Sequence, residues 1–348
     1  PLPFARRFRW DGSPDTARKR GLLRLGDEFG GTGHRKPHAN VRWLGGAREA
    51  GAMTVRDEDR GAVRVVTIDR PEVRNAVDGP TAQLLHDVFV GFDGDDGVSV
   101  AVLTGAGGTF CAGADLKAIS DRRGNSVLDV APSEIVGSLG PMGPTRLQLS
   151  KPVIAAVEGH AVAGGLELAC WADLRVAARD ATFGVYCRRW GVPLVDGGTV
   201  RLPRLIGQSR AADLILTGRG VDGVEAERIG LANRVVGPGE ALDAAVDLAA
   251  QIAELPQICL RSDRTSSLDQ WSLDLGGALS NETRLGLATI ASGETIAGAA
   301  RFAAGAGRHG DPARPVAPEP LPFALHSGWS APPESSRKRR RTDDWLRA

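Results

Sequence analysis

The chain has 348 residues, of which 42% are apolar, so it can form one large domain or two ordinary ones with a sizeable core. Its formal net charge is +1, but residues 1–52 carry +6, residues 311–348 carry +2 and residues 53–310 carry −7. An acidic central region argues against nucleic-acid binding there. No apolar run reaches the ~20 residues that a membrane-spanning helix needs, and the start of the chain shows no apolar signal segment.

Both ends of the chain have the composition of disordered segments. Residues 1–52 are rich in Arg, Gly and Pro without periodicity, and residues 311–348 are rich in Pro, Ser and Arg. We expect a disordered N-terminal extension and a disordered tail, in which the basic run 337–341 is a solvated charge cluster rather than a polyanion-binding patch. The four cysteines lack metal-ligand or disulfide spacing, which favours reduced thiols in a cytoplasmic protein.

The first elements predict a parallel sheet. Residues 63–68 (VRVVTI) form an apolar strand, residues 80–92 show helical spacing of apolar side chains, and residues 98–104 form the next strand. A strand, helix, strand order implies parallel strands joined by right-handed crossovers.

Two glycine-rich turns follow strands and are candidates for binding an anion. Residues 105–117 read GAGGTFCAGADLK, with free backbone N–H groups expected around 112–115. Residues 151–169 read KPVIAAVEGHAVAGGLELA, which predicts a strand over 152–157 and a helix that begins at Gly164 and Gly165. The first N–H groups of a helix lack internal partners and suit an oxygen that becomes negative during a reaction. By itself, Glu167 is equally consistent with a catalytic acid or base and with an N-terminal helix charge.

The second half of the chain is predicted to be mixed in structure. Residues 120–143 are irregular and resemble a lid or substrate loop. Short strands are expected over 174–178 and 181–184. Helices are expected over 209–217, 224–230, 240–253 and 275–302.

Five segments in this order resemble the crotonase (enoyl-CoA hydratase/isomerase) family over residues 55–310. They are DRPEVRNAV (69–77), FCAGADLK (110–117), GHAVAGGLELA (159–169), ADLRVAARDATFG (172–184) and GGTVRLPRLIG (197–207). The resemblance implies an α/β fold of repeated ββα units wound into a spiral, with a C-terminal helical region. It divides the chain into an extension (1–52), an acyl-CoA-binding core (53–260), C-terminal helices (261–310) and a tail (311–348). It also implies a homotrimer or hexamer.

The resemblance implies an active site for acyl-CoA thioesters. The backbone N–H groups of Ala114 and Gly164 would hold the thioester oxygen, and Glu167 would be an acid or base. Hydratases of the family use a second glutamate, and that position here is Cys187. Asp196 is the nearest replacement, although it is equally well interpreted as the N-cap of a helix that begins at Gly197.

Residues around the site have further candidate roles, of which only the coenzyme A contacts follow from the resemblance. The coenzyme A contacts would come from Arg74, Ala76, Ala112, Asp115 and Leu116. Arg188, Arg189 and Trp190 would neutralise Asp196, contact the phosphates or pack at a subunit interface. No cofactor is expected beyond the coenzyme A of the substrate, and no metal, membrane or nucleic-acid partner is expected.

These expectations favour an enoyl-CoA hydratase that adds water to a 2-enoyl-CoA through an enolate. Alternatives within the family are an enoyl-CoA isomerase and an acyl-CoA thioester hydrolase. Two other classes stay open: an acyl-CoA-binding protein without turnover, because the second glutamate is missing, and an RNA-associated family member that uses its basic ends.

Overall fold

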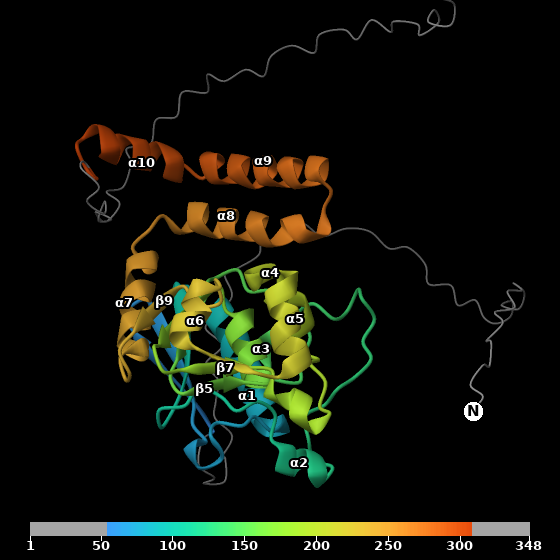
Figure 1. Cartoon of the computed structure of the whole chain (residues 1–348). Coiled ribbons are helices and arrows are strands. Elements are labelled where there is room, and N and C mark those ends of the chain that lie inside the picture. The colour runs from blue at the N-terminus through green and yellow to red at the C-terminus, as the bar shows by residue number, and fades with distance from the viewer. Residues whose placement is uncertain (1–53, 308–348) are drawn as a thin grey trace, which may run out of the picture. The chain divides into compact units, whose positions relative to one another are not determined.

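Two sheets organise residues 54–307, the part of the chain that the computed structural model describes (Figure 1). The predicted extension 1–52 and tail 311–348 lie outside the described residues. The larger sheet has the order β1-β2-β3-β4-β6-β9, and the smaller has the order β5-β7-β8. The fold class is therefore α/β, as predicted.

The larger sheet is parallel except at one edge, where β1 runs antiparallel to β2. Its strands are β1 (Val55–Arg60), β2 (Val63–Ile68), β3 (Val100–Gly105), β4 (Val153–Val157), β6 (Leu174–Ala178) and β9 (Arg234–Val236). In the smaller sheet β5 (His160–Val162) pairs parallel with β7 (Thr182–Gly184), and β7 pairs antiparallel with β8 (Gly220–Asp222).

Helices connect and cover these strands. The helices of the body are α1 (Gly79–Asp93), α2 (Leu116–Ser120), α3 (Gly164–Trp171), α4 (Gly198–Ile206), α5 (Gln208–Thr217), α6 (Gly223–Arg228) and α7 (Ala241–Ala253). Short 3-10 turns are η1 (Pro71–Val73), η2 (Pro144–Arg146) and η3 (Tyr186–Trp190). The predicted strands and helices of the body are thus present, with ends that differ by one or two residues.

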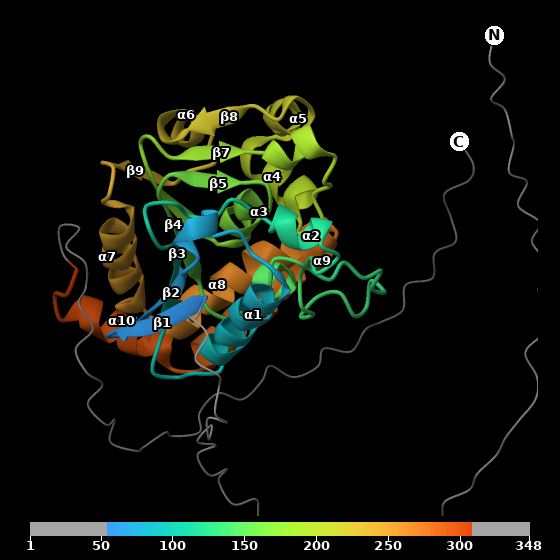
Figure 2. The ribbon, with the colours of Figure 1, turned by 90° about the horizontal axis from the view of Figure 1, so that it is seen from below.

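Side-chain alternation along the central strands explains the two layers of helices. In β4, Ile154 and Ala156 face α7, whereas Val153, Ala155 and Val157 face the opposite core. Figure 2 shows α7 on one side of the larger sheet and α1 and α3 on the other. Because both faces are covered, these strands read as continuous apolar runs in the sequence.

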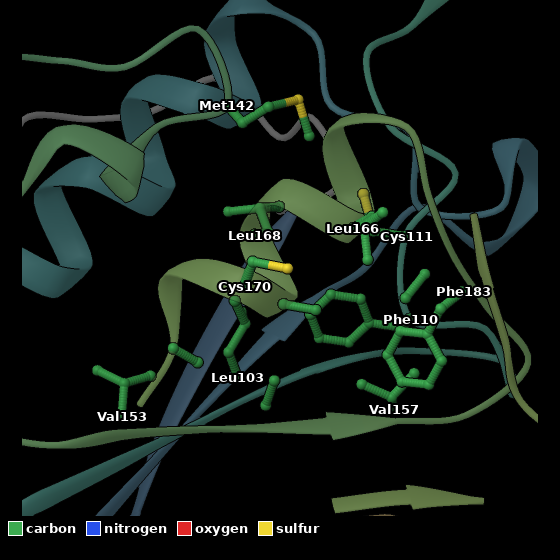
Figure 3. Packing of buried hydrophobic residues seen from close by; sticks show 14 of the residues in the cluster. Leu103, Phe110, Cys111, Met142, Val153, Val157, Leu166, Leu168, Cys170 and Phe183 are labelled. Atoms are coloured by element: carbon green, nitrogen blue, oxygen red, sulfur yellow. The ribbon is translucent and has the colours of Figure 1, made fainter. Parts of the chain in front are cut away.

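Helix α3 lies in the larger of the two cores. Its Leu166, Leu168 and Cys170 pack with Phe110 and Phe183, which come from either side of it in the sequence (Figure 3). At its C-terminal end, the buried guanidinium of Arg175 donates to the carbonyls of Ala169 and Ala172, at 3.3 and 2.8 Å. A cation at the negative end of the helix is favourable, so α3 is anchored at the end remote from its glycines.

Three helices follow the body: α8 (Gln257–Asp269), α9 (Leu275–Ala291) and α10 (Glu294–Ala303), with the turn η4 (Gln270–Ser272). Arg264 of α8 attaches them to the body by donating to Asp173 Oδ1 at 2.8 Å and to Leu149 O at 2.6 Å. The prediction of one helical stretch over 275–302 is corrected, because Gly293, at φ +86°, separates α9 from α10. The boundary predicted between residues 260 and 261 falls inside α8 and stays a prediction as a domain boundary.

Within residues 54–307, no helix combines the length and apolar character needed to cross a membrane.

Candidate active site

The start of α3 is held open by backbone geometry. Ala163, which precedes the helix, has φ +54°, a conformation that a non-glycine residue adopts at a cost and that is common at functional sites. Its N–H donates to Gly184 O at 2.9 Å, which fixes the turn on the smaller sheet. The helix therefore begins with Gly164, whose N–H has no acceptor within residues 54–307.

The two glycine-rich turns predicted from the sequence meet at this point. Gly113, at φ +98°, lies so close to α3 that a Cβ on it would be 2.9 Å from Gly164 N. Likewise, a Cβ on Gly165 would be 2.1 Å from Cys111 O. These two positions need glycine because the backbones touch.

Ala114 lies between two backbone hydrogen bonds that leave its own N–H unused. Val77 N donates to Gly113 O at 2.8 Å, and Asp115 N donates to Val77 O at 2.9 Å. Within residues 54–307, Ala114 N–H has no acceptor, and Ala114 and Gly164 line one cavity of about 870 Å³. The structure thus brings the two predicted anion donors together.

Glu167 lines the same cavity from the first turn of α3. Its side chain is only 2% exposed, and its Oε1 accepts from Asp196 N at 2.9 Å and from Gly198 N at 2.8 Å. Within residues 54–307, Oε2 has no hydrogen-bond partner. Burial, with a smaller contribution from the Asp196 carboxyl, raises the pKa of Glu167 to about 7. Such a carboxyl exchanges protons readily near neutral pH.

Asp196 is the second carboxyl in the cavity, and its side chain is not a helix cap. The N-cap of α4 is Gly197, and the first N–H of that helix donates to Glu167 instead. The helix-cap interpretation of Asp196 is therefore wrong. Its Oδ1 accepts from Met142 N at 2.9 Å and from the Thr145 hydroxyl. Burial raises the pKa of Asp196, although these two hydrogen bonds partly oppose the shift.

The groups that hold Asp196 come from a segment that sequence reasoning left undefined. Arg201 of α4 joins them, because its guanidinium donates to Asp196 O at 2.9 Å and to Thr145 O at 2.7 Å. We call Met142, Thr145 and Arg201 the Asp196 clamp. Met142 also packs on Gly164, where an added Cβ would lie 2.6 Å from its sulfur. The residues of the clamp are up to 59 positions apart, and no local pattern marks them.

Cys187 lines the cavity, and its thiol is not poised as a nucleophile. It is 6% exposed, and burial, together with the nearby Glu167, raises its pKa. The neighbouring arginines point to α5: Arg188 donates to Ile215 O at 2.9 Å and Arg189 to Gly218 O at 3.2 Å. The idea that they neutralise Asp196 is therefore wrong, because they cap the carbonyl end of a helix.

Three of the five predicted coenzyme A contacts, Arg74, Ala112 and Leu116, line the cavity, whereas Ala76 and Asp115 do not. Asp115 caps α2 by accepting from Lys117 N and Ala118 N, both at 3.1 Å, and it pairs with Arg70 at 3.2 Å. Its carboxylate is thus engaged by the protein, and a contact of these residues with coenzyme A stays a prediction.

Among residues 54–307, no group of three or more His, Cys, Asp or Glu side chains is placed to hold a metal ion. Cys111, Cys170, Cys187 and Cys259 are all free thiols.

The fold and the cavity define an α/β protein with a candidate active site at the N-terminus of α3. The profile of the enoyl-CoA hydratase/isomerase family matches residues 58–304. An enoyl-CoA hydratase of Mycobacterium tuberculosis is 35% identical over 71% of this chain and 92% of its own length. A carnitinyl-CoA dehydratase of Proteus mirabilis is 40% identical over 56% of this chain and 72% of its own.

Solved structures agree with these relatives. The crystal structure of an enoyl-CoA hydratase from Mycobacterium tuberculosis superposes with a TM-score of 0.67 at 38% identity, covering 72% of this chain and 96% of that one. A second, from Mycobacterium marinum, gives a TM-score of 0.66 at 35% identity, with the same coverage of both chains. The chain belongs to the enoyl-CoA hydratase/isomerase family and has the crotonase fold, as the sequence motifs predicted.

Proposed function

We propose that the protein adds water to the double bond of a 2-enoyl-CoA and releases a 3-hydroxyacyl-CoA. The observation that supports this most is the presence of two buried carboxyls, Glu167 and Asp196, in one cavity with the unused N–H groups of Ala114 and Gly164. Hydration needs a base for water, an acid for the α-carbon and a site for the thioester oxygen.

The donors would act on the oxygen of the thioester. As water attacks the β-carbon, electrons move through the α-carbon to this oxygen, which becomes an enolate. The N–H groups of Ala114 and Gly164 are already fixed by the backbone, so they stabilise the negative charge without reorganising. The N-terminal end of α3 adds its partial positive charge.

The two carboxyls would share the proton transfers. An ionised carboxylate takes a proton from the attacking water, and a protonated carboxyl gives one to the α-carbon. Burial raises the pKa of both carboxyls, and the charge of Asp196 raises that of Glu167 further, so one carboxyl can stay protonated while the other is ionised. Asp196 would thereby take the role of the second glutamate, which hydratases of the family carry at the position of Cys187. The reaction requires no cofactor beyond the coenzyme A of the substrate.

An isomerase is the second candidate. Cys187 puts a neutral thiol where a carboxylate would bind water, and a drier site favours moving a proton within the substrate. Such an enzyme would convert a 3-enoyl-CoA into a 2-enoyl-CoA with one carboxyl.

The C-terminal helices support a proposal of self-association. They expose large apolar side chains that a second copy of the chain would cover: Ile258, Leu268, Leu275, Leu279, Leu287, Ile290, Ile296 and Phe302. A trimer or a hexamer would be seen by light scattering coupled to size exclusion. A cytoplasmic location also stays a prediction.

The products of a substrate panel test these proposals. The purified chain is incubated with 2-enoyl-, 3-enoyl- and saturated acyl-CoA thioesters, and the products are separated by chromatography against 2-enoyl- and 3-enoyl-CoA standards before mass spectrometry. A hydratase gives the 3-hydroxyacyl-CoA, an isomerase an enoyl-CoA of unchanged mass, and a thioester hydrolase free coenzyme A. Binding of all the thioesters without any product would contradict an enzymatic role.

A further inference from the structure

One part of the cavity lining is mostly apolar and carries no charged side chain. It is formed by Tyr186, Cys187, Trp190, Val192, Pro193 and Val195, which we call the 186–195 wall. The Cys187 thiol is neutral because its pKa is raised. The wall adjoins both carboxyls, because Val195 precedes Asp196 in the chain and Glu167 is near enough to Cys187 to raise its pKa, and it includes Trp190, which is 71% exposed.

The same segment contains two arginines that do not line the cavity. Arg188 and Arg189 donate to carbonyls of α5 and of the residue that follows it, and the Arg189 guanidinium also stacks 4.0 Å from the ring centre of Tyr186. The turn η3 therefore directs its charges to a helix end and its apolar groups to the cavity. A wall built in this way disfavours a charged or strongly polar ligand.

A second element adds apolar surface to the cavity. Val127, on the irregular segment after α2, lines it and is 59% exposed, and Ile119 of α2 lines it and is 40% exposed. Together with Trp190 they leave apolar surface in contact with water. A hydrocarbon that covers this surface gains the free energy of removing it from water.

The order of atoms in the substrate, from the thioester through the α- and β-carbons to the rest of the acyl group, assigns the 186–195 wall to the acyl group. This step depends on the proposed function. With the thioester oxygen at Ala114 and Gly164, and the α- and β-carbons at Glu167 and Asp196, the rest of the acyl group must continue beyond the carboxyls. The 186–195 wall adjoins both carboxyls, so we assign it to the rest of the acyl group.

We propose that the natural acyl group is a large hydrocarbon, of roughly eight carbons or more, and that Trp190 is the residue that selects it. A short acyl group would end at the carboxyls and leave the indole uncovered. A long or ring-containing group would cover the indole and the side chain of Val127.

Affinities for unreactive saturated thioesters test this without turnover. Titration calorimetry with dodecanoyl-CoA and butanoyl-CoA should show that the protein binds the longer thioester at least about tenfold more tightly. Trp190→Ala should remove most of this preference by weakening dodecanoyl-CoA about tenfold while changing butanoyl-CoA by less than about twofold. Trp190→Phe should retain most of the preference, because it keeps an aromatic surface.

Leu216→Ala is the matched control. Leu216 on α5 is 75% exposed and does not line the cavity, so its loss should leave both affinities unchanged. Equal affinities for the two thioesters, or an equal loss of both on Trp190→Ala, would overturn the inference. A change in oligomeric state on Trp190→Ala with unaltered acyl affinity would also overturn it, because the indole would then be a subunit contact.

The two proposals can fail separately. If dodecanoyl-CoA is preferred and Trp190→Ala abolishes that preference, but no enoyl-CoA is hydrated, the acyl-size inference stands and the hydratase proposal is wrong. If enoyl-CoAs with four and twelve acyl carbons are hydrated with equal kcat/KM, the hydratase proposal stands and the acyl-size inference is wrong.

Discussion

Two sides of the cavity are built in different ways. On the side of Ala114 and Gly164, backbone geometry makes the site: two turns touch, and glycine is needed wherever a Cβ would collide. On the side of Asp196, side chains make the site: the carboxyl is held by the Asp196 clamp, whose members are far apart in the sequence. Backbone geometry leaves a local signature in glycine spacing, whereas a side-chain cluster leaves none.

This difference bears on the predicted departure from the family, a cysteine at the position of the second glutamate. The site of the two backbone donors depends on the close contact of two turns, so few residues can be substituted there. The second carboxyl needs only to reach the substrate, so it can come from another position. Cys187 and Asp196 are consistent with such an exchange. Changing each side separately tests the comparison, from the largest expected effect to the smallest.

Replacing Glu167 should have the largest effect on rate. Glu167→Gln removes proton transfer but keeps an oxygen that accepts from Asp196 N and Gly198 N, so kcat should fall by about 10³–10⁴ while the variant stays folded. Glu158→Gln is the control, because Glu158 also accepts from two backbone N–H groups, Gly239 N and Ala241 N, but lies outside the cavity. Similar rates for both variants would remove Glu167 from the reaction.

Removing one backbone donor should cost about 10²–10³ in kcat. Gly164→Pro removes the N–H, but any side chain at 164 also collides with Met142, so the test belongs in a Met142→Ala background. In that background Gly164→Ala keeps the N–H and serves as the control, with circular dichroism as the check of folding. Equal activity of the proline and alanine variants would show that Gly164 N–H does not contact the reacting oxygen.

Weakening the Asp196 clamp should cost less, about tenfold. Thr145→Val removes a hydrogen bond that lowers the pKa of Asp196, so that pKa should rise and the limb of the kcat/KM profile that reports Asp196 should move to higher pH. Thr145→Ser keeps the hydroxyl and should restore the profile. An unshifted profile for Thr145→Val, with only Tm reduced, would make Thr145 a structural residue alone.

The last test concerns the dependence of stability on pH and not the rate. The pKa of Glu167 is raised from 4.5 to about 7 in the folded protein. As pH rises from about 4.5 to 7, Glu167 therefore ionises in the unfolded chain before it ionises in the folded one. This lowers the free energy of unfolding by up to about 3 kcal/mol. The glutamine of Glu167→Gln does not ionise. The Tm of this variant, minus the Tm of the protein with Glu167, should therefore increase from pH 5 to pH 8 when both are measured by calorimetry. A constant Tm difference across this range would contradict a raised pKa.

The fold was largely predictable because its signals are local. Apolar runs marked β2, β3 and β4, and helical spacing marked α1 and α7. The edge strand β1 was missed, since five of its six residues are exposed and its sequence VRDEDR lacks the apolar alternation of a half-buried strand. Helix α8 was missed for a similar reason, because it has no fully buried side chain and shows no apolar stripe.

The site was predictable in part. Glycine spacing located Ala114 and Gly164, and the position of Asp196 followed from Gly197 and Gly198. Its role as a cap was one of two equal interpretations, and the structure excludes it because Glu167 accepts the N–H of Gly198. That contact joins residues 31 positions apart, and no propensity or periodicity predicts it.

The central claim is that Asp196 replaces the missing second glutamate. Asp196→Asn tests it most directly, because the amide oxygen of Asn can still accept from Met142 N and Thr145 and so keeps the clamp. With 2-enoyl-CoA as substrate, kcat should fall by at least about 10²-fold at unchanged Tm, and Cys187→Glu in the same chain should restore about tenfold or more. Full activity of a folded Asp196→Asn variant would contradict the claim.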